Sequence, residues 1–233
     1  MTKMRTIGLL GGMSWESTAT YYRAINKGVK EKLGGLHSAK ICMISVDFDE
    51  IEKLQHADDW DGAGDMLSRS AQAVEAGGAD FLVICTNTMH KVAAQLAQRI
   101  QIPILHIADA TAEHLKAKGL ERVGLLGTKF TMEQEFYAGR LRDQHGIQVL
   151  LPESEERSII HGVIYEELCL GNILDSSKRA FLDIIRKLHH RGAHGVILGC
   201  TEIAMLVQAS DTEIPLFATT AIHTQAAVER ALS

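Results

Sequence analysis

The two halves of the chain resemble one another, and this internal repeat constrains the fold more than any other feature. The stretch TIGLLGGMSWESTATYY matches RVGLLGTKFTMEQEFY further on, which sets Gly8 and Gly124 116 positions apart. GADFLVICTN recurs as GAHGVILGCTE, with Cys85 and Cys200 115 positions apart, and IPIL recurs as IPLF 112 positions later. Three matches in one order predict two similar lobes, one per half. The alternative is that any two α/β units share glycine turns and Val/Ile strands.

Apolar strand-like runs alternate with helix-like stretches, and this alternation predicts an α/β fold with parallel sheets. In the first half we expect strands at 6–12, 39–48, 80–86 and 102–107, and helices at 14–33, 60–79 and 87–100. The second half repeats this series. A chain of 233 residues can form one large domain or two small ones.

Composition excludes several classes of partner. A net charge of −5 favours neither nucleic acid nor an anionic membrane as partner. No apolar stretch approaches the roughly 20 residues that cross a bilayer, and the N-terminal apolar piece is too short for a signal peptide, so we predict a cytoplasmic protein. Four cysteines without C-x-x-C, H-E-x-x-H or a Cys/His cluster predict neither a disulfide scaffold nor a metal site.

Two cysteines end apolar strands, and each is followed by threonine. Ligands of parallel sheets bind beyond the carboxyl ends of the strands, where Cys85 and Cys200 are expected. If the lobes face one another across a cleft, the two thiols approach one ligand from opposite sides. A helix N-terminus after each cysteine would lower its pKa and supply a thiolate near neutral pH. Either cysteine alone could be a buried structural residue, the role expected for Cys42 and Cys169.

Opposed thiols are suited to inverting a carbon stereocentre. One thiolate removes a proton from one face and one thiol delivers a proton to the other, with the roles exchanged in reverse. A disulfide between the two is a further possibility, which a reducing cytosol opposes. Covalent catalysis by one cysteine would usually need a histidine; His90 follows Cys85, but nothing equivalent follows Cys200.

The turn GLLGGMSWEST lacks both the Walker pattern and G-x-G-x-x-G, so a nucleotide site is not expected. Its glycines either permit a tight turn or let the backbone N–H groups of Met13 and Ser14 approach a ligand. Hydroxyl and amide side chains beside the cysteines could hold a substrate carboxylate. These are Thr86, Asn87, Thr88 and Thr201.

The motifs GLLGGMS, CTNT and GCTE in this duplicated layout resemble the aspartate/glutamate racemase family, amino-acid racemases that work without pyridoxal phosphate. SWEST, CTNTMHK and LGGLHSA are most similar to its bacterial broad-specificity branch. The resemblance implies two Rossmann-like lobes related by a pseudo-twofold axis, with the active site in the cleft between them and no cofactor. It also implies that the strand after each cysteine-bearing helix joins the other lobe. Lobe one would then be 1–102 plus 215–233, and lobe two 103–214.

The same resemblance assigns the site. Cys85 and Cys200 would be the acid/base pair, and a homodimer is common among members. Residues around the substrate would be Met13, Gln55, Thr86, Asn87, Thr88 and Thr201, to which Ser14 and Glu202 are added from the motifs themselves. Glu202 either orients or assists Cys200, or is a favourable charge in the first helical turn.

Two departures bear on specificity. Aspartate-specialised members resemble a pattern with an arginine after the second strand and a lysine after IYE, whereas this chain has Lys53 in the first region and Cys169 in the second. Glutamate-type members have a histidine where Glu202 stands. We therefore predict a racemase of neutral or polar amino acids. The alternatives are an aspartate/glutamate-specific racemase, a cis–trans isomerase of an unsaturated diacid, or a non-enzymatic two-lobed amino-acid sensor.

Overall fold

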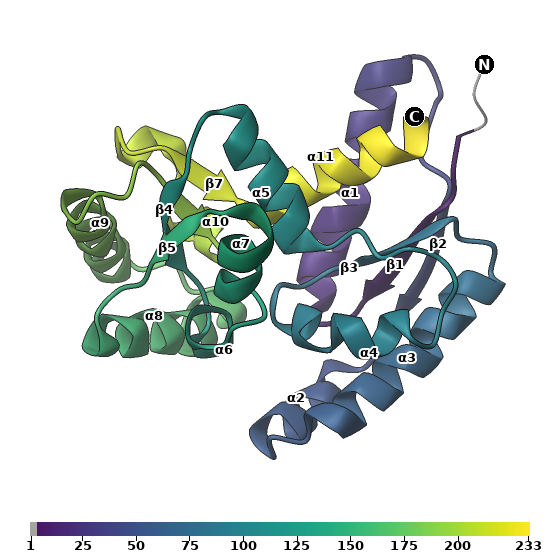
Figure 1. Ribbon diagram of the computed structural model, residues 1–233, viewed down its shortest axis with the longest axis horizontal. Coiled ribbons are helices and arrows are strands. Elements are labelled where there is room, and N and C mark those ends of the chain that lie inside the picture. The colour runs from purple at the N-terminus through teal and green to yellow at the C-terminus, as the bar shows by residue number, and fades with distance from the viewer. Residues whose placement is uncertain (1–3) are drawn as a thin grey trace. The chain divides into compact units, whose positions relative to one another are not determined.

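The computed structural model describes residues 4–233, and the chain in it divides into two compact units (Figure 1). Unit 1 comprises the chain up to Ile107 and resumes at His223, and unit 2 is Ala108–Ile222. Both units are built on parallel sheets, as the alternating sequence pattern predicts. None of the helices within residues 4–233 has the length and apolar character of a membrane span.

Unit 1 contains a three-stranded sheet of order β2-β1-β3, with β1 (Ile7–Gly11), β2 (Ile41–Ser45) and β3 (Phe81–Ile84). Its helices are α1 (Trp15–Leu33), α2 (Phe48–His56), α3 (Trp60–Ala76), the 3-10 helix η1 (Thr88–Val92), α4 (Ala93–Ala97) and most of α11 (Thr219–Leu232). β1 is the central strand because it pairs with both neighbours, Gly8 opposite Cys42 on one side and Leu82 on the other.

Unit 2 contains a four-stranded sheet of order β5-β4-β6-β7, with β4 (Arg122–Leu126), β5 (Gln148–Leu150), β6 (Val196–Leu198) and β7 (Leu216–Ala218). Its helices are most of α5 (Ile107–Ala117), α6 (Lys129–Glu133), α7 (Ala138–His145), α8 (Ser154–Glu166), η2 (Leu168–Leu170), α9 (Asp175–His190), α10 (Ile203–Leu206) and η3 (Ala209–Asp211). The order β5-β4-β6 matches β2-β1-β3, so the internal repeat of the sequence is a repeat of topology.

The matched glycines of the repeat occupy the central strands, where helices pack closely. A Cβ atom at Gly8 would lie 2.5 Å from Val74 Cγ1 of α3, and one at Gly124 would lie 2.9 Å from Leu188 Cδ1 of α9. Distances under 3 Å are not tolerated without displacement of the neighbour. The glycines therefore let α3 and α9 approach the sheets in their respective units.

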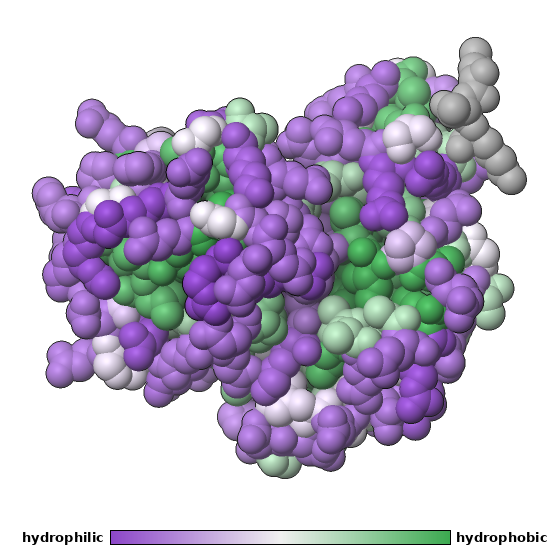
Figure 2. Space-filling model, in the orientation of Figure 1, coloured by the Kyte–Doolittle hydropathy of each residue, from purple (hydrophilic) through white to green (hydrophobic). Residues whose placement is uncertain are grey.

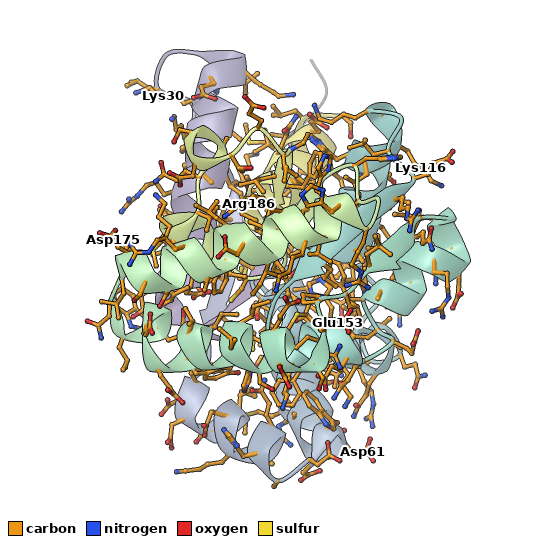
Figure 3. All side chains as sticks on the ribbon, turned by 90° about the vertical axis from the view of Figure 1, so that its left-hand side faces the viewer. Lys30, Asp61, Lys116, Glu153, Asp175 and Arg186 are labelled. Carbon is orange, nitrogen blue, oxygen red and sulfur yellow. The ribbon has the colours of Figure 1, made fainter. Side chains whose placement is uncertain are left out.

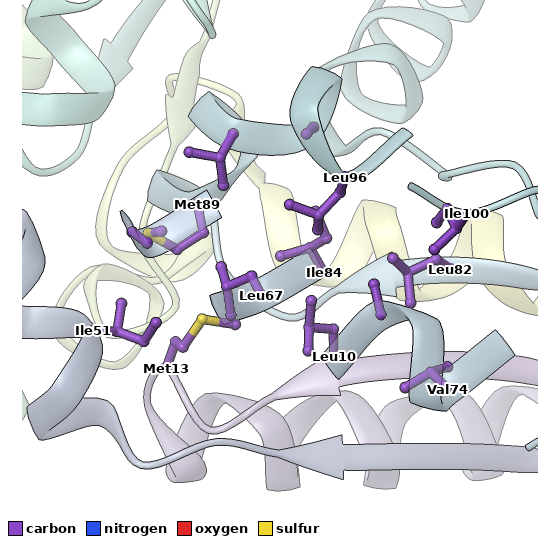
Figure 4. Packing of buried hydrophobic residues seen from close by; sticks show 14 of the residues in the cluster. Leu10, Met13, Ile51, Leu67, Val74, Leu82, Ile84, Met89, Leu96 and Ile100 are labelled. Atoms are coloured by element: carbon purple, nitrogen blue, oxygen red, sulfur yellow. The ribbon is translucent and has the colours of Figure 1, made fainter. Parts of the chain in front are cut away.

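β1 and β3 of unit 1 are buried on both faces, and alternate residues of each strand point to opposite sides. Leu82 and Ile84 belong to the cluster that includes Leu67 of α3 and Leu96 of α4, part of which is drawn in Figure 4. Phe81, Val83 and Cys85 share the opposite face with residues of α1 and α11, namely Tyr21, Ile25, Val29, Ala227 and Val228. The period of two therefore directs the Cys85 side chain toward α1 and α11.

The surface of each unit is largely hydrophilic on the face seen in Figure 2, with hydrophobic residues visible in gaps. In unit 2, α8 and α9 lie side by side and present many charged side chains (Figure 3). Lys187 of α9 and Glu156 of α8 form an ion pair of 2.7 Å across them. The lysine of this pair is exposed, whereas the glutamate side chain is only 12% exposed.

The predicted exchange of strands between lobes is wrong. Ile104, after the first cysteine segment, forms a parallel bridge with Leu82 of β3, and β7 pairs with β6. Each of these segments completes the sheet of its own unit because the unpaired edge beside the cysteine-bearing strand offers main-chain donors and acceptors. The chain instead changes unit within the helices that follow, at 107/108 in α5 and 222/223 in α11, beyond the expected boundaries at 102/103 and 214/215.

Three elements differ locally from expectation. α2 forms within a stretch for which no helix was predicted, and its N-cap Asp47 accepts a hydrogen bond from the Asp49 N–H at 3.2 Å. The helix predicted at 87–100 is divided into η1 and the five-residue α4. The strand predicted at 102–107 is reduced to the single bridge at Ile104.

Candidate active site

The first predicted catalytic residue, Cys85, follows β3 directly and is fully buried. Its N–H donates to the Leu10 carbonyl at 2.9 Å, which continues the pairing of β3 with the central strand. Its carbonyl accepts a hydrogen bond from Ser17 Oγ of α1 at 3.1 Å. The main chain at Cys85 is thus fixed from two sides, by the sheet and by the first turn of α1.

The turn after β1 requires glycine at position 12. Gly12 has φ of 97°, and a Cβ atom there would lie 2.1 Å from the Val46 carbonyl oxygen. The Gly12 N–H donates to Thr18 Oγ1 at 2.8 Å. Ser14 is the N-cap of α1, with its side chain accepting from the Ser17 N–H at 3.2 Å. Ser14 therefore caps α1, and Ser17 binds the main chain of Cys85.

Other predicted residues of unit 1 gather around the cysteine segment. Met13 is buried in the core cluster, beside Leu67 and Ile51 in Figure 4. Gln55 of α2 is only 5% exposed, and its Nε2 donates to Met89 Sδ at 2.9 Å. Thr86 is half-buried, and the two residues after it, Asn87 and Thr88, are buried. The fold thus brings α2, which the sequence did not predict, against the segment after Cys85.

Unit 2 contains the remaining predicted residues. Cys200 follows β6 after Gly199, whose N–H donates to the Leu126 carbonyl of β4 at 2.6 Å. Cys200 Sγ lies 2.8 Å from Glu202 Oε2, so the thiol donates to the carboxylate. The hydroxyl of Thr201 lies 3.2 Å from that of Thr220. Of the two roles considered for Glu202, direct contact with the thiol is the one that this geometry supports.

The two cysteines occupy equivalent places in their sheets. Cys85 follows β3, the neighbour of β1, and Cys200 follows β6, the neighbour of β4. In each case a main-chain N–H at the strand end donates to the last part of the central strand. Both lie at the carboxyl edge, where parallel sheets bind ligands.

The expected lowering of the thiol pKa is wrong for both cysteines. Burial raises the pKa of Cys85 above its ordinary value. Burial also raises the pKa of Cys200, which is only partly exposed, and the Glu202 carboxylate raises it further by charge and hydrogen bonding. The elements after the cysteines, a 3-10 helix and a helix of four residues, have too few aligned peptides for a strong dipole. Both groups are therefore thiols at neutral pH.

The sequence model of the Asp/Glu/hydantoin racemase family matches residues 10–227. The chain belongs to this family. Its membership makes the protein a racemase, and hence an isomerase. A candidate Asp/Glu racemase from Yersinia pestis has a solved structure that is 53% identical, covers 99% of this chain and 100% of its own, and superimposes with a TM-score of 0.95.

Two further relatives are more distant. An aspartate racemase homologue from Pyrococcus horikoshii OT3 is 32% identical over 99% of this chain and 100% of its own, with a TM-score of 0.87. The broad specificity amino-acid racemase RacX from Bacillus subtilis is 22% identical over 163 residues, or 70% of each chain. The two solved structures have the two-domain fold of Asp/Glu racemases, and the family model matches most of the chain, so the family resemblance read from the sequence motifs is confirmed.

The structure also gives the exposure of Lys53, Cys42 and Cys169, which the sequence analysis named. Lys53 is 70% exposed and pairs with Asp49 on α2. Cys42 is half-buried and packs against the unit 1 core, as predicted, but the packing role predicted for Cys169 is wrong, because that side chain is exposed after α8. Within residues 4–233 no group of three or more His, Cys, Asp or Glu side chains has the arrangement of a metal site.

Sequence reasoning missed one pair of residues near Cys85. Ser17 and Thr18 were considered only as part of a helix start, yet both bind main chain that shapes the site. The signal was available in the motif SWEST, where hydroxyl residues continue past the N-cap into the first turn. A hydroxyl inside a helix commonly indicates a tertiary hydrogen bond.

Proposed function

We propose that the protein is a cofactor-independent amino-acid racemase in which Cys85 and Cys200 act on opposite faces of one Cα. The observation that carries this proposal is their equivalence: each thiol follows the strand beside the central strand, at the carboxyl edge of its sheet. Inversion requires two such groups because the proton must leave one face and arrive at the other. Family membership supports the reaction class.

Glu202 gives Cys200 a route to the thiolate. The thiol already donates to the carboxylate at 2.8 Å, so proton transfer to Glu202 leaves a thiolate without movement of heavy atoms. The thiolate takes the Cα proton, and Cys85 donates its own proton to the other face of the carbanion. Afterwards Glu202 releases its proton to solvent and Cys85 regains one, which restores the starting state. In the reverse direction each proton moves back along the same path.

We propose a neutral or polar side chain for the substrate. A carboxylate side chain is normally held by a cation in bidentate or point-charge contact. Lys53, the cation in the region where aspartate-type members carry arginine, is paired with Asp49 and largely exposed. The name of the RacX relative, a broad specificity amino-acid racemase, supports a wide range of side chains. Met13, Ser14, Gln55, Thr86, Asn87, Thr88 and Thr201 are the proposed substrate contacts.

The experiment is incubation with single L-amino acids in heavy water, with acidic, neutral, polar and basic side chains tested in parallel. We expect the D-enantiomer to appear with deuterium at Cα for several neutral or polar substrates. Inversion confined to aspartate or glutamate would overturn the proposed specificity. Isomerisation of an unsaturated diacid without any amino-acid inversion would overturn the reaction.

Single substitutions test the two-thiol mechanism. Cys85→Ser and Cys200→Ser should each lower inversion by roughly 10²- to 10⁴-fold, because each removes one acid/base group. The remaining thiol should still exchange the Cα hydrogen of one enantiomer with solvent, and the two variants should prefer opposite enantiomers. Cys42→Ser, which changes a half-buried cysteine of the core, is the matched control. Wild-type turnover in either of the first two variants would refute the mechanism.

We also propose that the protein acts as a homodimer in the cytoplasm, a reducing compartment that keeps both thiols reduced. Three large apolar side chains of α1 and β2 are well exposed: Trp15 at 67%, Tyr22 at 51% and Met43 at 45%. They line a hollow of about 620 Å³ beside β2, which is the edge strand of its sheet. An exposed apolar patch beside the edge strand of a sheet is typical of an interface.

A further inference from the structure

Three histidines of unit 1 are buried together, although the proposed reaction uses none of them. His90 is 2% exposed, His106 8% and His223 fully buried. The ring centroid of His90 lies 4.6 Å from that of His106 and 5.7 Å from that of His223. His90 belongs to η1, His106 precedes α5, and His223 belongs to α11. Three segments distant in sequence therefore meet at these rings.

The hydrogen bonds of His90 define its protonation. Nδ1 lies 2.8 Å from the Thr86 carbonyl oxygen, which can only accept, so Nδ1 carries a hydrogen. The Ile107 N–H lies 3.2 Å from Nε2 and can only donate, so Nε2 carries none. The ring is thus neutral and in one tautomer. It joins the residue after Cys85 to the residue at which the chain leaves unit 1.

His223 makes the complementary set of contacts. Its Nε2 donates to the Leu105 carbonyl oxygen at 2.8 Å, and its Nδ1 accepts from the Tyr21 hydroxyl at 2.9 Å. This ring is also neutral, in the opposite tautomer. His223 is the residue at which the chain re-enters unit 1. His223, where the chain re-enters unit 1, is therefore bound to Leu105, and His90 binds both Ile107 and Thr86. Through these two rings the segment 105–107 is connected to the segment after Cys85.

We propose that His90 is a positioning residue that, supported by His223 and Tyr21, fixes the main chain of the Cys85–Thr88 segment against residues 105–107. The effect on rate rests on the proposed racemase function, but the effect on structure does not. A neutral imidazole suits this role because it offers a donor and an acceptor on opposite sides of one rigid ring. Loss of the ring removes one hydrogen bond from the part-buried Thr86 carbonyl and one from the buried Ile107 N–H.

Three substitutions separate the two hydrogen bonds of His90. His90→Asn retains a donor near Nδ1, His90→Gln retains an acceptor near Nε2, and His90→Ala retains neither. Tyr21→Phe removes the hydroxyl that donates to His223. Its matched control is Tyr137→Phe, the equivalent residue of the repeat, whose hydroxyl contacts Thr111 at 3.2 Å in unit 2.

The first readout does not depend on activity. Iodoacetamide labelling followed by peptide mass analysis gives separate rates for each cysteine. In His90→Ala, Cys85 should be labelled roughly 10- to 100-fold faster than in the wild type, because the Thr86 carbonyl and the Ile107 N–H both lose their hydrogen bond to the ring. Cys42, in the same unit, should keep its rate. An unchanged rate at Cys85, or equal acceleration of Cys42 and Cys85, would overturn the proposal.

The second readout is kinetic. We expect kcat in His90→Ala to fall roughly 10- to 100-fold with KM little changed, since a misplacement of about 1 Å at a reacting group has this effect. His90→Asn, which keeps the contact to Thr86, should recover more of kcat than His90→Gln. Tyr21→Phe should lower kcat and Tyr137→Phe should not. Equal kcat for the Asn, Gln and Ala variants would contradict positioning. Absence of any racemisation by the wild type would instead refute the proposed function and leave the labelling test standing.

Discussion

Acid should destabilise unit 1 through His223 in a predictable pH window. Burial lowers the pKa of His223 from 6.5 to about 4. The native state therefore binds fewer protons than the unfolded state below pH 6.5, and the free energy of unfolding falls as pH falls toward 4. Lowering the pKa from 6.5 to about 4 corresponds to about 3 kcal/mol in total, of which about 2 kcal/mol is lost between pH 7.5 and 5.

The assay is urea unfolding followed by tryptophan fluorescence at pH 7.5, 6.5 and 5. Both tryptophans of the chain, Trp15 and Trp60, lie in unit 1, so the signal reports the unit that contains His223. His223→Gln removes the titrating group and keeps a donor for the Leu105 carbonyl. Carboxylate titration affects both proteins and cancels in the difference. Burial is the first cause of the lowered pKa of His90, and the charges of His106 and His223 lower it further, so the part due to His223 belongs to the measured difference.

The wild type should exceed His223→Gln in stability at pH 7.5, and this advantage should shrink by about 2 kcal/mol by pH 5. His37→Asn, which changes an exposed histidine of the same unit, is the control for a general effect of removing a histidine. Parallel pH dependences for the wild type and His223→Gln would refute the reasoning, because they would mean that His223 titrates alike in the folded and unfolded chain.

Two further predictions concern the second thiol and the apolar patch. Burial raises the pKa of Cys200 most, and Glu202→Gln removes the charge that raises it further. Iodoacetamide labelling of Cys200 at pH 8 should therefore become faster. Racemisation should fall roughly 10- to 100-fold, because the proton acceptor is lost. Faster labelling with full activity would exclude the proton transfer to Glu202. Tyr22→Lys places a charge in the exposed patch of α1, so light scattering after size exclusion should give the mass of a monomer where the wild type gives that of a dimer. If the variant and the wild type had the same mass in solution, the proposed interface would be wrong.

The sequence alone determined the repeat, the parallel α/β class and the pair of cysteines at strand ends. These features are local: glycine turns, period-two apolar runs and short motifs follow from residue types over a few positions. Gly8 and Gly124 occupy matching positions of the repeat, and helices pack so closely there that no side chain fits. The same periodicity directed Cys85 to the face of α1 and α11.

Only the tertiary structure decided the properties that depend on distant neighbours. The thiol pKa rises with burial and with the Glu202 carboxylate, which outweigh the short helices that follow. The strands after the cysteines stay in their own sheets because main-chain groups there are available for pairing. His90 and His223, 133 positions apart, meet because α11 returns to unit 1. Burial and hydrogen bonding between such segments depend on the folded chain as a whole, so a local sequence pattern does not predict them.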